Sequence, residues 1–304
     1  MKKLLLCLAL MPALNSHIMA CEACGCAASN PYFGLLPQTQ TNFIGFQYID
    51  RKFNTNIQHH GSASVESANE HYRTFQVWSR VHISKRIQLI GILPYSINTQ
   101  HEEGEHANTI DGLGDATLIA NFKLVNKENC SLQQTLLIGG GVKLPTGNYN
   151  TQSVESGQTL PNMQPGTNSW DFVANANYTV RRKAIGMNVD ASYTATTANK
   201  EDYKFGNRTS MGISGFYQLR LKQISILPLA GVRYDQAAKD YLYYSSGIMD
   251  EDGGGWQLFA SQGIQAYYKR VGIQLMCYEP LSQHYMSGFV KTKFRSEVGF
   301  IVRI

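Results

Sequence analysis

The chain has few charged residues and only one long hydrophobic run. Charged side chains make up 16% of the 304 residues, and the formal net charge is only +5. This mild charge is spread along the sequence, which argues against a basic surface of the kind that binds nucleic acid. The single apolar run, from Leu4 to Leu14, is too short to cross a membrane as a helix. We therefore expect neither a nucleic-acid partner nor a helical membrane protein.

The motifs of several enzyme classes are also absent. No nucleotide-binding glycine loop, nucleophile elbow or zinc-protease helix occurs in the sequence. We therefore expect that the protein is not an enzyme. Glycine and tyrosine, by contrast, are abundant, with 27 and 17 residues respectively. In a chain without membrane helices, this composition favours a β protein.

Residues 1–20 are typical of a secretory signal peptide. Two lysines precede the apolar run, and the small residue Ala20 ends it. We expect cleavage after Ala20, either as an ordinary secreted protein or at a lipoprotein box that acylates Cys21. Because Cys7 leaves with the signal peptide, an odd number of the 6 cysteines remains. At least one thiol of the mature chain is then unpaired, lipidated or metal-bound.

Short segments in which apolar and polar residues alternate recur to the end of the chain. In 170–180 and 184–195, every second residue is apolar, and only a basic turn separates the two segments. A period of two is typical of β-strands with one apolar face. We predict about twelve strands, at approximately 40–50, 71–83, 86–98, 112–125, 132–144, 168–180, 184–195, 205–219, 222–236, 254–268, 270–282 and 289–304.

Short and long connections alternate between these segments, as in outer-membrane barrels, whose turns are short on the periplasmic side and longer outside. The sequence therefore predicts an all-β fold: a transmembrane, antiparallel, up-and-down β-barrel in the outer membrane of a Gram-negative bacterium. The barrel occupies 39–304 and follows a Cys-rich periplasmic arm at 21–38. The expected outer loops include 51–70, 99–111, 145–167 and 237–253.

The same alternation predicts which side chains point into the lumen. The apolar set faces lipid, so the polar set, with charges of both signs, lines the interior. Two interpretations stay open: a channel for a small solute, or a lumen filled by its own salt bridges. The predicted lumen residues are Asp115, Asn121, Lys123, Lys143, Asp171, Asn175, Asn188, Asp190, Arg233, Asp235, Arg295 and Glu297.

Two glycine-rich stretches carry a family resemblance. The sequences GLGDATLIANFKL at 112–124 and GGGVKLPTG at 139–147 resemble a family of outer-membrane transporters labelled after the meta-pathway of phenol degradation. The resemblance covers roughly 40–304 and implies a barrel that takes up or exports a small molecule. Neither stretch is catalytic, and the Cys-rich start is not part of the pattern.

The cysteines Cys21, Cys24 and Cys26 form a Cys-x-x-Cys-x-Cys pattern behind the signal peptide. Three thiolates at this spacing suit copper(I) or zinc, although no fourth ligand is apparent. A disulfide, Cys24 with Cys26 or Cys21 with Cys24, is the default in the periplasm, and lipidation of Cys21 is a further alternative. The pattern thus predicts a lipid anchor, a disulfide or a metal site.

Two other groups of side chains are candidate sites. The loop from His101 to His106 holds two imidazoles and three glutamates, which suit a divalent ion, but a solvated polar loop accounts for them better. His82 and Ser84 are the one close pair that could serve an outer-membrane hydrolase. Their predicted place at the periplasmic end disfavours that role.

The sequence thus predicts an outer-membrane barrel that carries a small solute, with a link to transition-metal handling. One alternative is a non-conducting barrel whose CEACGC arm docks a periplasmic metalloprotein. A hydrolase is the minor alternative. The expected partners are outer-membrane lipid, a small-molecule solute and a periplasmic protein, and the only cofactors considered are copper and zinc.

Overall fold

The computed structural model describes residues 41–58, 65–102, 107–128, 132–152, 161–244, 247–250 and 253–304. The predicted signal peptide and arm, with Cys21, Cys24 and Cys26, lie outside these residues. Within the described residues, no helix is long and apolar enough to cross a membrane.

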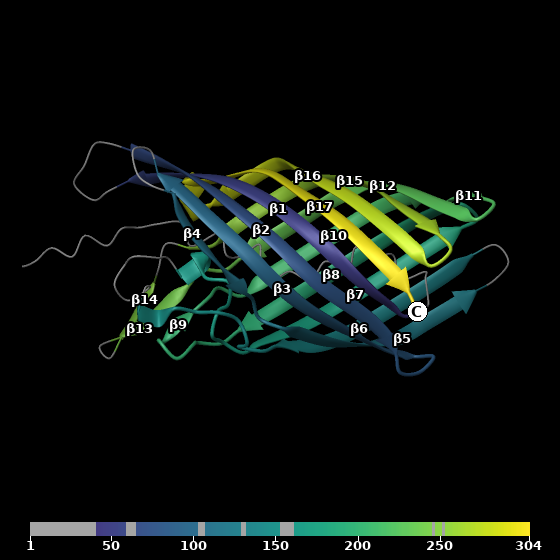
Figure 1. Cartoon of the computed structure of the whole chain (residues 1–304), viewed down its shortest axis with the longest axis horizontal. Helices are drawn as coiled ribbons and strands as arrows, with labels where there is room; N and C mark the ends of the chain where they lie inside the picture. The colour runs from purple at the N-terminus through teal and green to yellow at the C-terminus, as the bar shows by residue number, and fades with distance from the viewer. Residues whose placement is uncertain are drawn as a thin grey trace, which may run out of the picture.

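The described chain is almost entirely β-strand (Figure 1). The strands are β1 (Phe43–Gln58), β2 (Val65–His82), β3 (Ile87–Glu102), β4 (Asn108–Leu113), β5 (Thr117–Glu128), β6 (Gln133–Lys143), β7 (Asp171–Arg182), β8 (Ile185–Thr196), β9 (Tyr203–Lys204), β10 (Arg208–Tyr217), β11 (Leu219–Leu221), β12 (Ile224–Ala237), β13 (Tyr241–Tyr244), β14 (Gly247–Asp250), β15 (Gly255–Tyr268), β16 (Val271–Tyr285) and β17 (Val290–Arg303).

One sheet closes on itself to form the barrel. Each barrel strand pairs antiparallel with its neighbour in the chain, and β1 pairs with β17 to complete the circle. β4 and β5 both pair with β3, and β10 and β11 both pair with β12, so each of these pairs shares one position in the barrel. The result is the predicted closed barrel of twelve strands. Closure gives the backbone N–H and C=O groups of each strand hydrogen-bond partners on its neighbours. Such partners are required in lipid, which offers none of its own.

A small second sheet lies at the end of the barrel opposite the C-terminus (Figure 1). It consists of β9, β13 and β14, in the order β14-β13-β9. The Tyr203 hydroxyl donates a hydrogen bond to Asp240 Oδ2 at 2.8 Å, and both residues are buried. The connection at 237–253 therefore contains strands, where the sequence predicted an outer loop.

The outer ends of the first strands are longer than predicted. The stretch 51–70 was expected to be a loop, but β1 and β2 pair through most of it, for example Thr55 with Ala68. Likewise β3 and β4 pair within 99–111, for example Thr99 with Thr109. These two expectations were wrong because the outward-facing residues here are polar. The alternation of apolar and polar residues therefore stops where the strands leave the membrane, although the backbone hydrogen bonds between the strands continue beyond that point.

The outer wall of the barrel is apolar. Every barrel position presents exposed hydrophobic side chains, and the buried positions between them face inward. Such a band is what the hydrocarbon core of a bilayer contacts. One exposed residue from each position is Phe46, Val77, Leu93, Leu118, Ile138, Phe172, Val189, Ile213, Val232, Ile264, Ile273 and Phe300.

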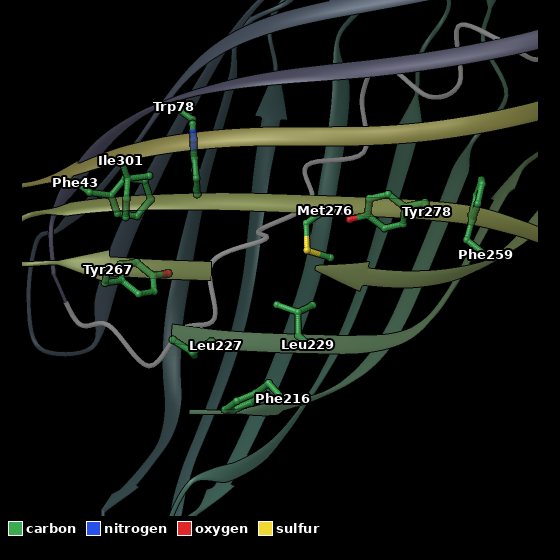
Figure 2. Packing of buried hydrophobic residues seen from close by; sticks show 10 residues of the cluster. All are labelled: Phe43, Trp78, Phe216, Leu227, Leu229, Phe259, Tyr267, Met276, Tyr278 and Ile301. Carbon is green, nitrogen blue, oxygen red and sulfur yellow. The ribbon is translucent and has the colours of Figure 1, made fainter. Parts of the chain in front are cut away.

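The interior contains a buried apolar cluster as well as polar groups (Figure 2). Within it the rings of Phe43 and Trp78 meet edge to face, with centroids 4.5 Å apart. Most of the cluster lies toward the short turns, and Tyr278 and Phe259 extend it to the level of Arg295 and Arg233. Its members are Phe43, Trp78, Phe216, Leu227, Leu229, Phe259, Tyr267, Met276, Tyr278 and Ile301.

Inward-facing glycines make room for these large side chains. A Cβ placed on Gly186 would lie 2.1 Å from the Phe216 ring, and one on Gly263 would lie 2.2 Å from the Met276 sulfur. Each bulky side chain therefore lies over a glycine of the neighbouring strand. Large and small residues alternate around the wall, as filling a narrow barrel requires.

This packing predicts that Gly186→Leu destabilises the barrel by about 1–3 kcal/mol, the usual cost of overpacking. The measurement is the temperature at which the purified protein changes from its folded to its unfolded mobility on a gel. Gly215→Leu is the matched control, because a Cβ at Gly215 meets nothing within 4 Å. Equal transition temperatures for the two variants would contradict the packing argument.

Candidate functional site

The lumen is the candidate functional site, because it gathers the charged side chains of the barrel. All nine predicted charged lumen residues occupy inward-facing positions, eight of them buried and Asp190 partly buried. They are Asp115, Lys123, Lys143, Asp171, Asp190, Arg233, Asp235, Arg295 and Glu297.

Five of these residues form a chain of alternating charges. Arg233 Nη2 lies 2.8 Å from Asp190 Oδ2, and Arg233 Nη1 lies 3.8 Å from Asp235 Oδ1. Arg295 Nη1 then lies 3.5 Å from Asp235 Oδ2, and Arg295 Nη2 lies 2.6 Å from Glu297 Oε1. Each of these buried charges thus has an opposite charge beside it, which offsets the cost of removing it from water.

This charge ladder, defined as Asp190, Arg233, Asp235, Arg295 and Glu297, reaches across the interior. Arg295 is on β17 and Asp235 on β12, and two further strands, β15 and β16, lie between them in the sheet. Their contact therefore bridges non-adjacent strands.

Neutral side chains extend the ladder along the wall. Gln47 Nε2 donates to Glu297 Oε2 at 2.9 Å, and Gln76 Nε2 donates to Gln47 Oε1 at 2.8 Å. The Arg295 guanidinium also lies 4.7 Å from the centre of the Tyr278 ring. A bonded belt of polar groups thus narrows the middle of the lumen.

A second ionic cluster lies beneath the β6–β7 connection. Lys143 Nζ lies 2.6 Å from Asp171 Oδ2 and 3.2 Å from Asp115 Oδ2. Asp115 also accepts hydrogen bonds from the backbone N–H of Gly147 and of Thr167, each at 2.9 Å. The carboxylate of Asp115 therefore holds two points of the connection against the barrel wall.

The connection at 145–167 was predicted as an outer loop, and its described parts correct that prediction. Asn98 of the wall donates to the carbonyl oxygen of Met163 at 2.9 Å, and Met163 and Gln164 are buried. The part 161–167 folds into the barrel and includes the short 3-10 helix at Pro161–Met163. The part 145–152 runs along the wall, where Asn148 N donates to Leu113 O at 2.7 Å. The polar composition of 145–167 led to the prediction of a solvent-exposed loop. The same composition also suits a segment that contacts the polar lumen.

The two glycine-rich stretches meet at this anchor. Ala116 N donates to Thr146 Oγ1 at 2.9 Å, and Leu144 N donates to Ala116 O at 2.8 Å. A Cβ on Gly147 would lie 2.7 Å from the Gly166 Cα and 2.8 Å from Asp115 Oδ1, so this approach requires glycine. The two stretches therefore fix the inward-folded connection in place.

A pocket opens between this connection and the wall. Aromatic and proline side chains line it together with amides and the paired charges of Lys143 and Asp115, and Tyr72, Phe205 and Arg208 are among its walls. The cavity there has a volume of about 60 Å³. A small molecule with apolar and polar parts fits such a lining.

The other predicted sites are less well placed. His101 is exposed near the end of β3, whereas His106, Cys21, Cys24 and Cys26 lie outside the described residues. Among the residues that the structure describes, no group of three or more His, Cys, Asp or Glu is arranged to hold a metal ion. Cys277 is a free thiol on the outward face of β16.

His82 and Ser84 are bonded to other groups. The His82 Nδ1 lies 3.1 Å from Asn42 Oδ1, and the Ser84 hydroxyl oxygen accepts the backbone N–H of Arg86 and Ile87. Ser84 thus stabilises the turn, and His82 is tied to the start of β1. The arrangement does not resemble a nucleophile with its base.

Sequence reasoning missed Arg51, which is only 2% exposed inside the barrel. Its Nη2 donates to Thr74 Oγ1 at 3.4 Å. Arg51 is two residues after Ile49 and four after Gln47, so all three lie on the same, inward face of β1. This alternation would have predicted the inward position of Arg51. The predicted strand at 40–50 ended one residue too early to include it.

Comparison with known proteins agrees with this architecture. A family described as "Putative MetA-pathway of phenol degradation" matches residues 47–240, which is more than half of the chain. The chain belongs to this family. No curated protein matches the sequence. The matched region includes both glycine-rich stretches that anchor the β6–β7 connection.

Solved structures share the fold. The crystal structure of an outer membrane channel from Pseudomonas putida F1 is 14% identical and covers 90% of this chain and 99% of its own, with a TM-score of 0.64. The β domain of the Bordetella autotransporter BrkA is 7% identical, covers 87% and 100%, and has a TM-score of 0.51. The transport unit of the autotransporter AIDA-I from Escherichia coli is 10% identical, covers 92% and 96%, and also has a TM-score of 0.51.

These similarities show a common fold. Together with the closed antiparallel sheet and its apolar outer band, the fold places this family member in the outer membrane of a Gram-negative bacterium.

The anchor predicts a specific effect of Asp115→Ala. Loss of the carboxylate leaves the partly buried N–H donors of Gly147 and Thr167 without their acceptor, each at the lower end of about 1–3 kcal/mol. We expect a lower unfolding temperature and faster cleavage within 144–152 by a protease added to the purified barrel. The control is Asp111→Ala, which removes an exposed carboxylate nearby. If both variants are cut at the wild-type rate, Asp115 does not anchor the connection.

Proposed function

We propose that this barrel is an outer-membrane channel for a small, partly apolar solute and has no enzymatic activity. The observation that carries the proposal is the lumen itself, which combines a charged belt with a buried apolar cluster and has a pocket at each end. The Pseudomonas putida protein with this fold is described as an outer membrane channel, which supports transport.

The two linings suit different parts of one molecule. At the outer end, amides and paired charges beside Tyr72 and Phe205 offer hydrogen bonds and ring contacts. Toward the turns, Trp78, Tyr267 and Met276 offer an apolar surface. A solute with an apolar body and one polar group is therefore favoured over a fully hydrated ion.

A non-conducting barrel is the second candidate, and the charge ladder favours it. The contact between Arg295 and Asp235 bridges strands that are not neighbours, and a belt of this kind also fills a narrow barrel. The two candidates differ in whether current crosses the protein.

Conductance in planar bilayers distinguishes them. A channel predicts discrete current steps for the full chain, and larger steps for the double variant Asp235→Ala with Arg295→Ala, because two side chains that cross the lumen are shortened together. Asp50→Ala with His71→Ala is the control, since it removes a pair on the outer face whose atoms are 2.8 Å apart. If the folded wild type and the folded double variant both carry no current, the channel proposal is contradicted and the non-conducting barrel is favoured.

A role in copper or zinc handling is a further proposal that rests on the sequence of the arm. Cys21, Cys24 and Cys26 supply soft thiolates on what is predicted to be the periplasmic side. Such a site would serve the barrel as a metal-loading point or as a docking point for a periplasmic metalloprotein.

Elemental analysis tests this role. If the thiolates bind metal, Cys24→Ser with Cys26→Ser lowers the copper or zinc content of the purified mature protein to background. Cys277→Ser serves as the control, because that thiol faces outward from the barrel. Equal metal content in wild type and the double variant would end the metal proposal.

A further inference from the structure

The described short turns at the closed end of the hairpins carry only positive charge. They comprise 83–86, 183–184, 218–223 and 269–270, and they contain lysines and arginines but no aspartate or glutamate. With the N-terminus predicted to be periplasmic, this end is the periplasmic mouth. The charge of these four turns is therefore one-sided, in contrast to the compensated ladder deeper in the lumen, and the β5–β6 hairpin at the same end adds Lys127 and Glu128.

A pocket with a volume of about 270 Å³ opens at this mouth. Four of its lining side chains are cationic, Arg181, Arg220, Lys222 and Arg303, and no described carboxylate lines it. The remaining lining residues are three glutamines, Ser225, Tyr267 and the apolar residues Ile224 and Leu227. An excess of cations around a concave site concentrates anions there.

Two of the four cations, Arg181 and Arg303, are held in position, whereas Arg220 and Lys222 are exposed. Arg181 donates to the amide oxygens of Gln133 on β6 and of Gln218 between β10 and β11. The Arg303 guanidinium lies 4.4 Å from the centre of the Tyr267 ring. Tyr267 belongs to the apolar cluster, so the basic rim continues directly into an apolar surface.

The backbone of the turns adds an independent observation. Lys183, Lys222 and Lys269 adopt positive φ angles of 54°, 50° and 50°. Glycine and asparagine adopt this conformation most easily, and another residue there costs roughly 1 kcal/mol. Lysine is the first turn residue in all three hairpins. A positively charged side chain therefore occupies a position whose backbone conformation favours glycine or asparagine, both uncharged.

We propose that the pocket at the periplasmic mouth binds an organic anion, a molecule with an apolar body and a carboxylate, as it enters or leaves the lumen. The carboxylate contacts the cationic rim formed by Arg220, Lys222 and Arg303. The apolar body lies against Leu227 and Tyr267. This inference rests on the proposed channel function and deepens it, because it specifies the charge of the solute.

Binding tests the site without relying on conductance. Benzoate is the probe and benzamide its uncharged counterpart, titrated into the full chain in a non-ionic detergent by calorimetry. We expect benzoate to bind more tightly than benzamide. Arg220→Gln with Lys222→Asn should weaken benzoate binding about tenfold or more, the value of one charge-assisted hydrogen bond.

The substitutions also control for folding. Lys222→Asn places a residue that favours positive φ in the turn, so the barrel should remain at least as stable. Lys269→Asn is the matched control, since it has the same backbone conformation but does not line the pocket. Benzamide binding as tightly as benzoate, or equal binding by both variants, would overturn the inference.

Two further measurements identify the ligand and separate the anion site from the channel. Displacement of benzoate by phosphatidylglycerol in mixed micelles would assign the pocket to lipid headgroups and overturn a soluble anion as its ligand. In bilayers with a KCl gradient, the wild-type reversal potential should show anion preference, and the double variant should lose it. A barrel that binds benzoate but carries no current would retain the anion site and refute the proposed channel.

Discussion

The pairing of β1 with β17 is the constraint on which the rest of this structure depends. It joins the first and last strands of the barrel and leaves no free edge in the described barrel sheet. In lipid an open edge would leave backbone N–H and C=O groups without partners, at several kilocalories per mole each. Once the circle is closed, every second residue must face the interior, and the chemistry of the lumen follows from the sequence.

The interior resembles the core of a soluble protein more than a water-filled pipe. Charges are arranged in compensated pairs, and large side chains lie over glycines of the adjacent strand. The inward-folded connection adds a layer of its own, held by Asp115 and Lys143. A solute that crossed such an interior would have to exchange contacts with it, so its selection would depend on chemistry as well as on size.

The sequence predicts the barrel well and its filling only in part. The alternation of 170–180 and 184–195 predicts β7 and β8 closely, and the position of each charge on an inward face follows from the same period. The contact between Asp235 and Arg295 does not follow, because it depends on the curvature that brings β12 and β17 within reach. The inward fold of 161–167 also escapes local patterns, since its anchors, Asp115 and Asn98, lie far away in the chain.

The charge ladder crosses the lumen through the contact of Asp235 with Arg295, and a double-mutant cycle on Asp235→Ala and Arg295→Ala measures the strength of that contact. Unfolding free energies of the wild type, both single variants and the double variant would be measured by urea titration in detergent. We expect a coupling energy of about 0.5–3 kcal/mol, as for residues in direct contact. Additive effects of the two substitutions would contradict it, because the two side chains would then not interact across the barrel.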